Sequence, residues 1–388
     1  MFFPLDAPMK NYAWGSPDVI SAFRGSEASG EPEAEQWFGH HPQSQTGIEA
    51  SGETHVFAQW LLERGLQFPV LVKLLAAAQP LSIQVHPGFS EAAEGFAAEE
   101  RRGVDEAQRT YRDPSAKPEL LIALSPGFRA LVGFVEPETT AGRLAVWRAA
   151  GLDSATAEML HENLGGPLEE SVSWLLGDGH DLRRCLEGID SWVNNRALWA
   201  DSLEDRREEV ALVRELWSFY PGDPGVLFSL LMHHVVLGRG EALFVDAGVV
   251  HAYLQGFGLE VMLPSDNVVR AGLTAKRRDG GEFLKVAKLL SEAFPPVIRP
   301  VKQDGVWSYQ GFPADFHVSH IVEPSHVSLG GAAAMVVVES GAAPLSGNLS
   351  ERPVSPGEVI FVTGDEVELT ASETDMSIWV VHPARSEV

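Results

Sequence analysis

The sequence predicts a mainly β protein with a helical segment inserted near its middle. Short apolar runs bounded by glycine and proline fill residues 1–134, which is typical of strands in a sandwich or barrel. From about residue 136 to 222 the apolar positions adopt helical spacing, and strand-like runs return from there to the C-terminus. A chain of 388 residues has room for roughly two or three domains.

The longest apolar stretch, residues 68–85, is expected to form strands. Lys73 and Pro80 interrupt it, and these interruptions argue against a membrane-spanning helix. Strands are expected at three of the N-terminal apolar runs: 69–72, 120–124 and 130–134.

Two stretches of the middle segment show helical spacing. Pro167 opens the first, and the apolar residues that follow it recur at helical intervals, which suits proline in a first helical turn. The second, residues 202–220, begins with charged residues and places its apolar residues on one face. The sequence Pro-Gly-Asp-Pro-Gly at 221–225 is then expected to end this helix.

A short internal repeat links the first and last β regions. Residues 240–245 read Gly-Glu-Ala-Leu-Phe-Val, and residues 357–362 read Gly-Glu-Val-Ile-Phe-Val. Each copy is expected to be a turn followed by a short apolar strand. If the repeat is genuine, the chain contains two related β-domains. Only the first copy leads to a histidine, His251, so we expect one working site and one decayed site.

The acidic composition limits the classes of partner. The net charge is −25, from 29 basic and 54 acidic residues, and this charge disfavours binding to nucleic acid or to anionic membranes. The single cysteine, Cys185, excludes an internal disulfide and a thiolate metal cluster, so a cytoplasmic location is expected. We expect no secretory signal and see no indication of an obligate protein partner.

Residues 251–274 combine functional groups that a structural segment does not need. An imidazole (His251), two carboxylates (Glu260 and Asp266) and a guanidinium (Arg270) lie in one short stretch. A metal-assisted reaction on an anionic substrate uses this combination: a metal ligand, groups for proton transfer and a cation for the substrate. The alternative for His251, which follows an apolar run, is a buried core histidine.

The arginine in this stretch and the cations that follow it suggest a site for an anion. Arg270 is flanked by apolar residues, and such an arginine often reaches an interior polar site and binds carboxylate or phosphate there. Residues 276–278, Lys-Arg-Arg, form a basic cluster in an otherwise acidic chain. An ordinary solvated loop is the alternative interpretation of this cluster.

Two upstream segments supply further candidate ligands. In an extended strand Ser82, Gln84 and His86 point to one side, and a glutamine oxygen with a histidine nitrogen can form half of a zinc site. Lys117 and Glu119 share a face if a strand begins there. The simpler alternatives are a strand-end histidine bonded to a loop carbonyl and a solvated carboxylate at a strand start.

Other motifs are weaker or missing. His40 and His41 precede a proline in an expected loop, and His233 and His234 lie in an apolar segment where histidines are more often packed than ligating. The sequence contains no nucleophile elbow, Walker loop, dinucleotide fingerprint or cysteine-based zinc spacing.

Together and in this order, these segments resemble the type I mannose-6-phosphate isomerases (phosphomannose isomerases). One family signature, a Tyr–Asp turn ending in Lys-Pro-Glu, is matched at 111–119, and a second, from His-Ala-Tyr to Arg-Ala-Gly and Thr, at 251–274. The block Pro-Leu-Ser-Ile-Gln-x-His-Pro is matched at 80–87. Two N-terminal motifs, at 11–15 and 35–42, also resemble the family.

Departures from the family pattern affect substrate contacts but no implied ligand. The family's Asn-His in the first signature is Ser115-Ala116 here, and the proline before the lysine of the second is Ala275. Leu263-Pro264 replaces the family's usual small residues. Substrate contacts near Ser115 and Ala275 therefore cannot be carried over from the family.

The resemblance implies a fold of two cupin-type jelly-roll β-domains plus a helical domain. The catalytic jelly roll would comprise residues 1–135 with 226–285, the helical insertion 136–225, and the C-terminal jelly roll 286–388. The resemblance also implies one Zn²⁺ per chain. The zinc ligands that it implies are Gln84, His86, Glu119 and His251.

The implied activity is zinc-dependent aldose–ketose isomerisation of D-mannose 6-phosphate and D-fructose 6-phosphate, by proton transfer through an enediol. Zn²⁺ and Arg270 would stabilise the negative charge that develops on the enediol oxygens. Lysines qualify for proton transfer if burial lowers their pKa. The candidates for proton transfer are Glu260, Asp266, Lys117 and Lys73. The candidates for holding the 6-phosphate are Ser82, Lys73, Lys276 and Arg270.

Two other functions stay open at this point. A cupin-type metal-dependent oxidoreductase using Fe(II) typically has two or more histidines plus a carboxylate, and Gln84 weighs against it. A non-enzymatic sugar-phosphate binder would keep Arg270 and the basic cluster at 276–278 but would turn nothing over.

Overall fold

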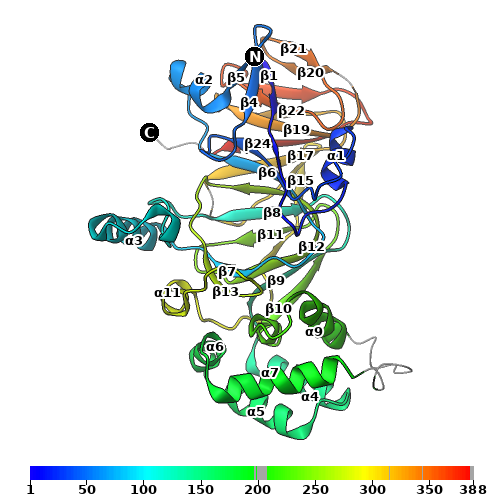
Figure 1. Ribbon diagram of the computed structural model, residues 1–388. Helices are drawn as coiled ribbons and strands as arrows, with labels where there is room; N and C mark the ends of the chain where they lie inside the picture. Colours follow the sequence, from blue (N-terminus) through cyan, green and yellow to red (C-terminus); the bar gives the residue numbers. More distant parts are fainter. Residues whose placement is uncertain (196–197, 199–207, 314, 343, 385–388) are drawn as a thin grey trace.

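The computed structural model describes residues 1–195, 198, 208–313, 315–342 and 344–384. The molecule is elongated, with β-sheets over most of its length and a group of helices at one end (Figure 1). This arrangement confirms the predicted fold class, a mainly β protein with a helical part. That the β regions are cupin-type jelly rolls stays a prediction.

The strand β12 (His251–Met262) is the centre of the larger sheet, in which the described residues contribute eleven strands. It pairs antiparallel with four strands that lie far upstream in the sequence. Its alternating apolar side chains are buried, which holds this long strand between its neighbours. The partners of β12 are β6 (Leu71–Ala77), β7 (Ile83–Val85), β8 (Glu119–Ala123) and β9 (Phe128–Phe134).

The rest of this sheet surrounds the central strand. Strands are found at all three of the predicted N-terminal runs, in β6, β8 and β9. The remaining strands are β2 (Met9–Lys10), β3 (Glu35–Gly39), β10 (Met232–Leu237), β11 (Ala242–Val245), β13 (Val269–Gly272) and β14 (Val297–Ile298).

A second β region contains a nine-stranded and a four-stranded sheet among the described residues. The side chains buried between these two sheets are apolar, such as Val336, Ile360 and Val380. In order, the nine strands are β15 (Val301–Gln303), β16 (Val306–Ser308), β17 (Phe316–Ile321), β24 (Ser377–Pro383), β19 (Ala334–Ser340), β22 (Val359–Val362), β1 (Phe2–Asp6), β4 (Gly47–Ala50) and β5 (Glu53–Val56). The four strands are β18 (Ser325–Ser328), β23 (Glu368–Ala371), β20 (Pro344–Gly347) and β21 (Glu351–Pro353).

The N-terminal strand β1 belongs to the second β region. It pairs antiparallel with β22, from Phe2 opposite Val362 to Leu5 opposite Val359. The N-terminal ammonium lies 3.1 Å from the buried carboxylate of Glu366 and fixes the start of the strand there. Sheet membership therefore crosses the predicted domain division at residue 286, and that division stays a prediction. Both copies of the internal repeat do form strands, β11 and β22.

The inserted region forms a bundle of helices below the larger sheet (Figure 1). The helix predicted after Pro167 is confirmed as α6 (Leu168–Leu176), and the second predicted helix is confirmed as α9 (Glu208–Phe219). Residues 202–207 of that prediction lie outside the described residues. The other helices here are α4 (Pro137–Ala149), α5 (Ser154–Leu164), α7 (His180–Val193) and α10 (Gly225–Phe228). Helices elsewhere are α1 (Val19–Arg24), α2 (Phe57–Glu63), α3 (Phe89–Arg102) and α11 (Gly280–Val286).

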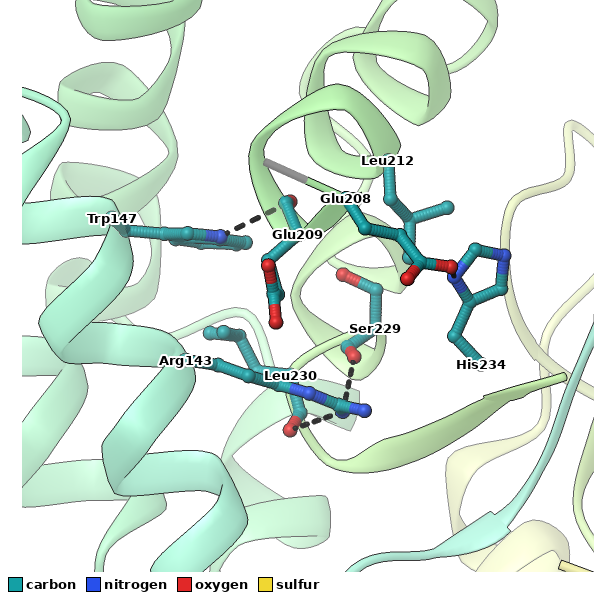
Figure 2. Close-up of a pocket in the computed structure, with 8 residues that line it drawn as sticks. All are labelled: Arg143, Trp147, Glu208, Glu209, Leu212, Ser229, Leu230 and His234. Carbon is teal, nitrogen blue, oxygen red and sulfur yellow. Dashed lines mark hydrogen bonds and ion pairs between the residues drawn. The ribbon is translucent and has the colours of Figure 1, made fainter. Parts of the chain in front are cut away.

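A half-buried arginine joins the helical region to the sheet (Figure 2). The Nη1 of Arg143, on α4, donates to the carbonyl oxygens of Ser229, Leu230 and Met232 at 3.0, 3.1 and 2.6 Å. These carbonyls follow the short helix α10, and that of Leu230 also accepts from the Thr140 hydroxyl at 3.3 Å. Burial lowers the pKa of Arg143, but a guanidinium stays charged at neutral pH.

No helix in the described part of the chain is long and apolar enough to cross a membrane. The prediction that the stretch at 68–85 forms strands rather than a membrane helix is confirmed, because it contains β6 and β7.

Two glycines allow the helical region to approach β13, the strand that carries Arg270. A Cβ added at Gly272 would lie 2.5 Å from the Cα of Gly225, and one added at Gly225 would lie 2.4 Å from the backbone nitrogen of Leu273. Both distances are too short for a side chain, so the two backbones can pack only if both residues are glycine.

We expect Gly272→Ala to lower the free energy of unfolding by about 1–3 kcal/mol, because the added methyl group forces α10 and β13 apart. It should also lower kcat, since Arg270 lies on the same short strand. Urea unfolding and steady-state kinetics measure the two effects. The matched control is Gly142→Ala in α4, where a Cβ meets open space, and it should be neutral or stabilise by up to about 1 kcal/mol. Equal stability of both variants would contradict the packing argument.

Candidate metal centre and substrate pocket

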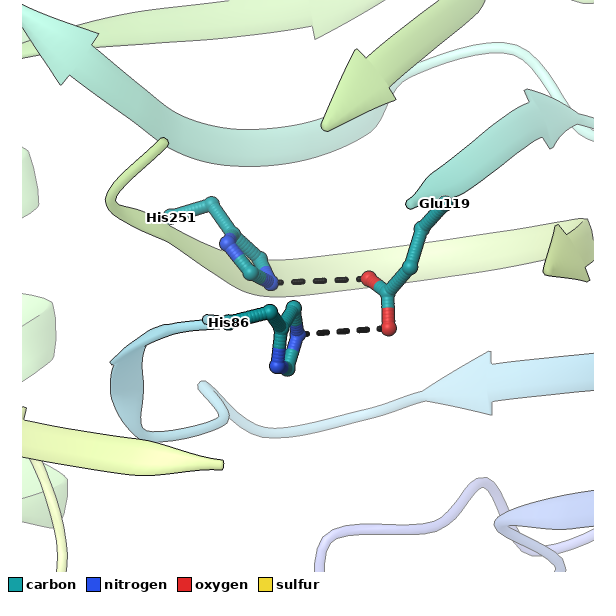
Figure 3. Close-up of side chains that lie close together, drawn as sticks. All are labelled: His86, Glu119 and His251. Carbon is teal, nitrogen blue, oxygen red and sulfur yellow. Dashed lines mark ion pairs between the residues drawn. The ribbon is translucent and has the colours of Figure 1, made fainter. Parts of the chain in front are cut away.

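Three predicted ligands meet in the interior of the larger sheet (Figure 3). His86 follows β7, Glu119 begins β8 and His251 begins β12. The Nε2 of His86 lies 3.3 Å from one Glu119 carboxylate oxygen, and the Nε2 of His251 lies 3.5 Å from the other. The three ligand atoms fall within 4.8 Å of one another, and all three residues are buried. Glu119 is therefore not a solvated carboxylate at a strand start, and the role of the three residues as metal ligands stays a prediction.

Backbone carbonyls fix the protonation of both histidines. The Nδ1 of His86 is 2.7 Å from the carbonyl oxygen of Asn267, and the Nδ1 of His251 is 3.1 Å from that of Val249. Because carbonyls only accept, each Nδ1 carries the proton and each Nε2 presents a lone pair to Glu119. Burial lowers the pKa of His86 to about 4, with a further contribution from Lys117, so this ring is neutral at pH 7.

This arrangement fits a bound cation. The Nε2 of His86 is buried and has no hydrogen-bond partner, although it faces a carboxylate. Two lone pairs and a negative charge in a dry interior repel one another unless a positive ion lies between them. A histidine whose second nitrogen is held by a backbone carbonyl is the usual geometry of a zinc ligand.

Gln84, the fourth ligand predicted from the sequence, lies beside this group. It lies opposite His251 where β7 meets β12, and its Nε2 is 3.3 Å from the Nε2 of His251. Rotation of the terminal amide would direct its oxygen, which now accepts from the Ser82 hydroxyl at 3.4 Å, toward the same point. The predicted alternation of Ser82, Gln84 and His86 along one side of a strand agrees with these contacts.

Lys117 and Tyr253 complete the surroundings of Glu119. The Lys117 ammonium pairs with one carboxylate oxygen, which confirms that these two side chains share a face, and the Tyr253 hydroxyl donates to the other at 3.2 Å. Burial alone would raise the pKa of Glu119. The charge of the neighbouring Lys117 ammonium outweighs burial and holds that pKa well below its usual range. Glu119 is therefore ionised, as a metal ligand must be.

A second buried ion pair lies next to this group, on adjacent strands. The ammonium of Lys73, on β6, is 2.9 Å from Glu260, on β12, and 3.7 Å from Glu35, on β3. Burial opposes the charge on Lys73, but the two carboxylates raise its pKa above the ordinary value. The condition for proton transfer by Lys73, a pKa lowered by burial, is therefore not met. For Glu260, burial and the nearby Glu119 raise the pKa.

A cavity of about 680 Å³ lies beside these buried groups; Gln84 and Lys117 line it, whereas His86, Glu119 and His251 are not in its lining. Most of the residues predicted from the sequence are brought together around it, although they come from four separate segments. Glu260 is buried behind its ion pair with Lys73 and is not in the lining. The predicted residues that line the cavity are Lys73, Ser82, Gln84, Lys117, Asp266, Arg270 and Lys276.

Asp266 presents its carboxylate to the cavity and is held by residues that sequence reasoning passed over. The Nε2 of His41 lies 3.4 Å from the Asp266 carboxylate, and the Gln43 amide donates to the same oxygen at 3.3 Å. The Nδ1 of His41 accepts from the backbone N–H of Gln43, which places the ring proton on Nε2, toward Asp266. Burial raises the pKa of Asp266, but the hydrogen bond from His41 and the charges of Lys117 and Lys73 more than compensate, so the pKa is lowered.

The sequence also gave no role to Asn267, which organises the turn at 111–119. Its side-chain oxygen accepts from the backbone N–H of Arg112 at 2.7 Å, and its amide donates to the carbonyl oxygens of Asp113 and Ser115 at 2.8 and 2.9 Å. Asn267 thus ties the turn before β8 to the loop before β13. Its position within the Ser-Asp-Asn of the second family signature was the available signal.

Three further lining residues were not assigned a role from the sequence. Tyr12 and Trp37 come from the two N-terminal motifs, and Arg112 comes from the turn that Asn267 organises. The charge of Arg112 contributes, after burial, to the lowered pKa of Arg270, which shows that the two guanidinium groups act on each other. The cavity therefore gathers more positive charge than the sequence predicted.

The other two conspicuous histidines are structural, as expected. The Nδ1 of His234 lies 2.8 Å from the Glu208 carboxylate, next to the helical region (Figure 2), and the Nε2 of His233 lies 2.9 Å from the carbonyl oxygen of Glu292. Neither belongs to the group around Glu119.

Comparison with known proteins gives one consistent family. A family model described as phosphomannose isomerase type I, catalytic domain, matches residues 2–136. The mannose-6-phosphate isomerase of Escherichia coli (strain K12) is 34% identical over 384 residues, which cover 93% of this chain and 95% of the relative. The mannose-6-phosphate isomerase of Salmonella typhimurium is 35% identical over 388 residues, which cover 94% and 96%.

Solved structures agree with the sequence relatives. A zinc-bound crystal structure of mannose 6-phosphate isomerase has a TM-score of 0.84 to this structure at 32% identity, and the match covers 99% of this chain and 100% of that chain. A crystal structure of a variant phosphomannose isomerase from Salmonella typhimurium has the same TM-score, identity and coverage. The chain described here therefore belongs to the type I phosphomannose isomerase family.

Proposed function

We propose that the protein is a zinc-dependent aldose–ketose isomerase that interconverts D-mannose 6-phosphate and D-fructose 6-phosphate. One observation carries the proposal: a buried group of two unprotonated imidazole nitrogens and a carboxylate adjoins a cavity lined by Arg270 and Lys276. The relatives named above are isomerases by name, and one was crystallised with zinc. The substrate we propose is a free hexose 6-phosphate, and the compartment is the cytoplasm.

We assign the metal to Gln84, His86, Glu119 and His251. This ligand set carries a single negative charge, so a bound Zn²⁺ would keep Lewis acidity and would polarise the substrate oxygens at C1 and C2. The protein fixes the positions of the ligands through its own contacts. Both Nδ1 atoms are hydrogen-bonded to backbone carbonyls, and Lys117 and Tyr253 contact the Glu119 carboxylate.

We assign the proton transfer between C1 and C2 to Asp266 rather than to Glu260. Asp266 lines the cavity, and its lowered pKa keeps it ionised and able to accept a proton. Glu260 is buried against Lys73 at 2.9 Å and serves to hold that ammonium in place. Lys117 lines the cavity while paired with Glu119, so it is placed to donate a hydrogen bond to a substrate oxygen.

The cations of the cavity divide into two groups by position. Arg270 lies opposite Gln84 where β13 meets β7, next to the implied metal, so its guanidinium is placed to stabilise charge on the enediol. Lys276 follows on the loop after β13, with its ammonium 6.0 Å from the ring of Tyr12. We propose that Lys276 and Ser82 hold the 6-phosphate and that Lys73 donates to a sugar hydroxyl.

Removal of the metal should abolish the isomerase activity, and added Zn²⁺ should restore it. Without a cation, the lone pairs of His86 and His251 face a carboxylate, so the chelated protein should also melt at a lower temperature. Coupled assay of ketose formation and differential scanning calorimetry measure the two effects. Mg²⁺ should not restore activity, because it prefers six oxygen ligands. Full activity of the metal-free protein would refute the zinc assignment.

Arg270→Lys should lower kcat about 10²–10³-fold with little change in KM, because an ammonium cannot reproduce the two-pronged contact of a guanidinium with developing charge. The matched control is Arg278→Lys, whose side chain is exposed and lies 3.9 Å from Asp223. Steady-state kinetics of both variants decide the role, and an unchanged kcat for Arg270→Lys would dismiss it.

Asp266→Asn should lower kcat about 10²–10⁴-fold, since an amide cannot accept the proton from carbon. The exposed Asp246, paired with Lys288 at 2.9 Å, provides the control Asp246→Asn, which should keep full activity. Glu260→Gln should mainly destabilise the fold, because it leaves Lys73 with only the more distant Glu35. A reversed pattern, with Asp266→Asn active and Glu260→Gln folded but inactive, would transfer the proton-transfer role to Glu260.

A further inference from the structure

Asp266, to which we assign the proton transfer, is carried by a loop rather than by a strand or a helix. The loop connects β12 to β13, and 32% of the Asp266 side chain is exposed. A group that moves a proton at carbon must be held within about 0.5 Å of its productive position, and a loop does not provide this precision by itself. The carboxylate therefore needs side-chain partners that fix its direction.

Space for a wrong orientation is present next to this carboxylate. Asp266 lines the substrate pocket and also a second cavity, of about 700 Å³, beside α2. Leu61, Leu66 and Phe68 give that second cavity an apolar part. Because Asp266 borders both cavities, rotation of its side chain into the second one would take the carboxylate away from the substrate.

Two side chains from the loop after β3 contact the Asp266 carboxylate. The Nε2 of His41 lies 3.4 Å from its Oδ2, and the Gln43 amide donates to the same oxygen at 3.3 Å. Gln43 is exposed, whereas the side chain of His41 keeps only 4% of its surface accessible. His41 is therefore the more rigid of the two partners.

His41 is itself fixed by three contacts. Its Nδ1 accepts from the backbone N–H of Gln43 at 3.1 Å, and its ring meets Trp37 edge-on, with centroids 5.1 Å apart. Its backbone carbonyl accepts from the Ser44 hydroxyl at 2.8 Å. These contacts hold the ring in one orientation and one tautomer, with the Nε2–H toward Asp266.

The nearby ammonium groups cannot replace this contact. Lys73 and Lys117 favour the ionised form of Asp266 through their charge, but they are paired with other carboxylates, those of Glu260 and Glu119. In the ion pairs of the described residues neither lysine is joined to Asp266. A charge at longer range keeps a carboxylate ionised without fixing its direction, whereas a hydrogen bond is directional.

We propose that His41 is a positioning residue for the proton transfer: its imidazole donates one hydrogen bond that holds the Asp266 carboxylate toward the substrate and out of the second cavity. This role depends on the proposed isomerase activity, with Asp266 as the group that moves the proton. Among the described residues the ring contacts Trp37, Gln43 and Asp266 and no proposed zinc ligand. Loss of the bond should therefore slow the removal of the proton from carbon and leave the binding of zinc and substrate intact.

Two substitutions in the zinc-loaded, full-length protein separate the hydrogen bond of His41 from its packing. In His41→Gln the amide nitrogen reaches the place of Nε2, so kcat should stay within about threefold of the native value. In His41→Asn the shorter amide can still accept from Gln43 but cannot reach Asp266, so kcat should fall about 10–10²-fold with little change in KM. Steady-state kinetics, zinc content and melting temperature are measured for both. The matched control is His40→Asn, at the exposed neighbouring histidine, which should behave like the native protein.

Mannose 6-phosphate with deuterium at C2 shows whether the slowed step is the proton transfer. His41→Asn should raise the deuterium isotope effect on kcat above that of the native protein, because cleavage of the bond to hydrogen then limits the rate. A merely structural role would lower the amount of active protein and would not change the isotope effect.

Three results would overturn the role of His41: an unchanged kcat in His41→Asn, no rise in its isotope effect, or an equal loss of kcat in both His41 variants. Absence of turnover in the native, zinc-loaded protein would instead refute the proposed function, and the role of His41 with it. If His41→Asn fails to fold, His41→Leu takes its place, because it fills the space of the ring without a donor.

Discussion

Two imidazole lone pairs and one carboxylate face each other across 3.3 and 3.5 Å in a dry interior, and the larger sheet is arranged around this contact. His251 begins β12, His86 follows β7 and Glu119 begins β8, and β7 and β8 both pair with β12. In low dielectric such a contact is repulsive without a cation. The protein therefore holds its ligands by other means: backbone carbonyls on both rings, and Lys117 and Tyr253 on the carboxylate.

Around this contact the charged groups are divided between two layers. The inner layer, with Lys73, Glu260 and Glu35, is buried and paired, so it fixes geometry and resists changes of protonation, although Lys73 and Glu35 also reach the cavity lining. Arg270 and Lys276, in the layer that lines the cavity, have no carboxylate partner in the ion pairs of the described residues. An acidic protein thus presents a local positive surface to an anionic sugar, because these two cations lie together in the cavity.

Local sequence patterns were sufficient to predict which side chains form much of this site. Side chains two residues apart in a strand point to the same side. This rule correctly placed Ser82, Gln84 and His86 together, and Lys117 with Glu119. Contacts between distant segments had no such signal. The bond from His41 to Asp266 joins an N-terminal loop to the loop before β13, and no local pattern reports it. The direction of the pKa shift of Lys73 could not be predicted for the same reason, since both of its carboxylate partners lie on other strands.

The position of β1 determines the order in which the protein can be completed during synthesis. This strand is synthesised long before one of the two strands that it pairs with, β22, which ends at residue 362, whereas the other, β4, follows soon after it. Until then the edge of β1 that pairs with β22 has no partner, and such edges are the usual starting points of aggregation. All strands of the larger sheet except β14 have been synthesised by residue 272. The metal-binding half of the molecule can therefore fold before the last strands of the second β region have been synthesised.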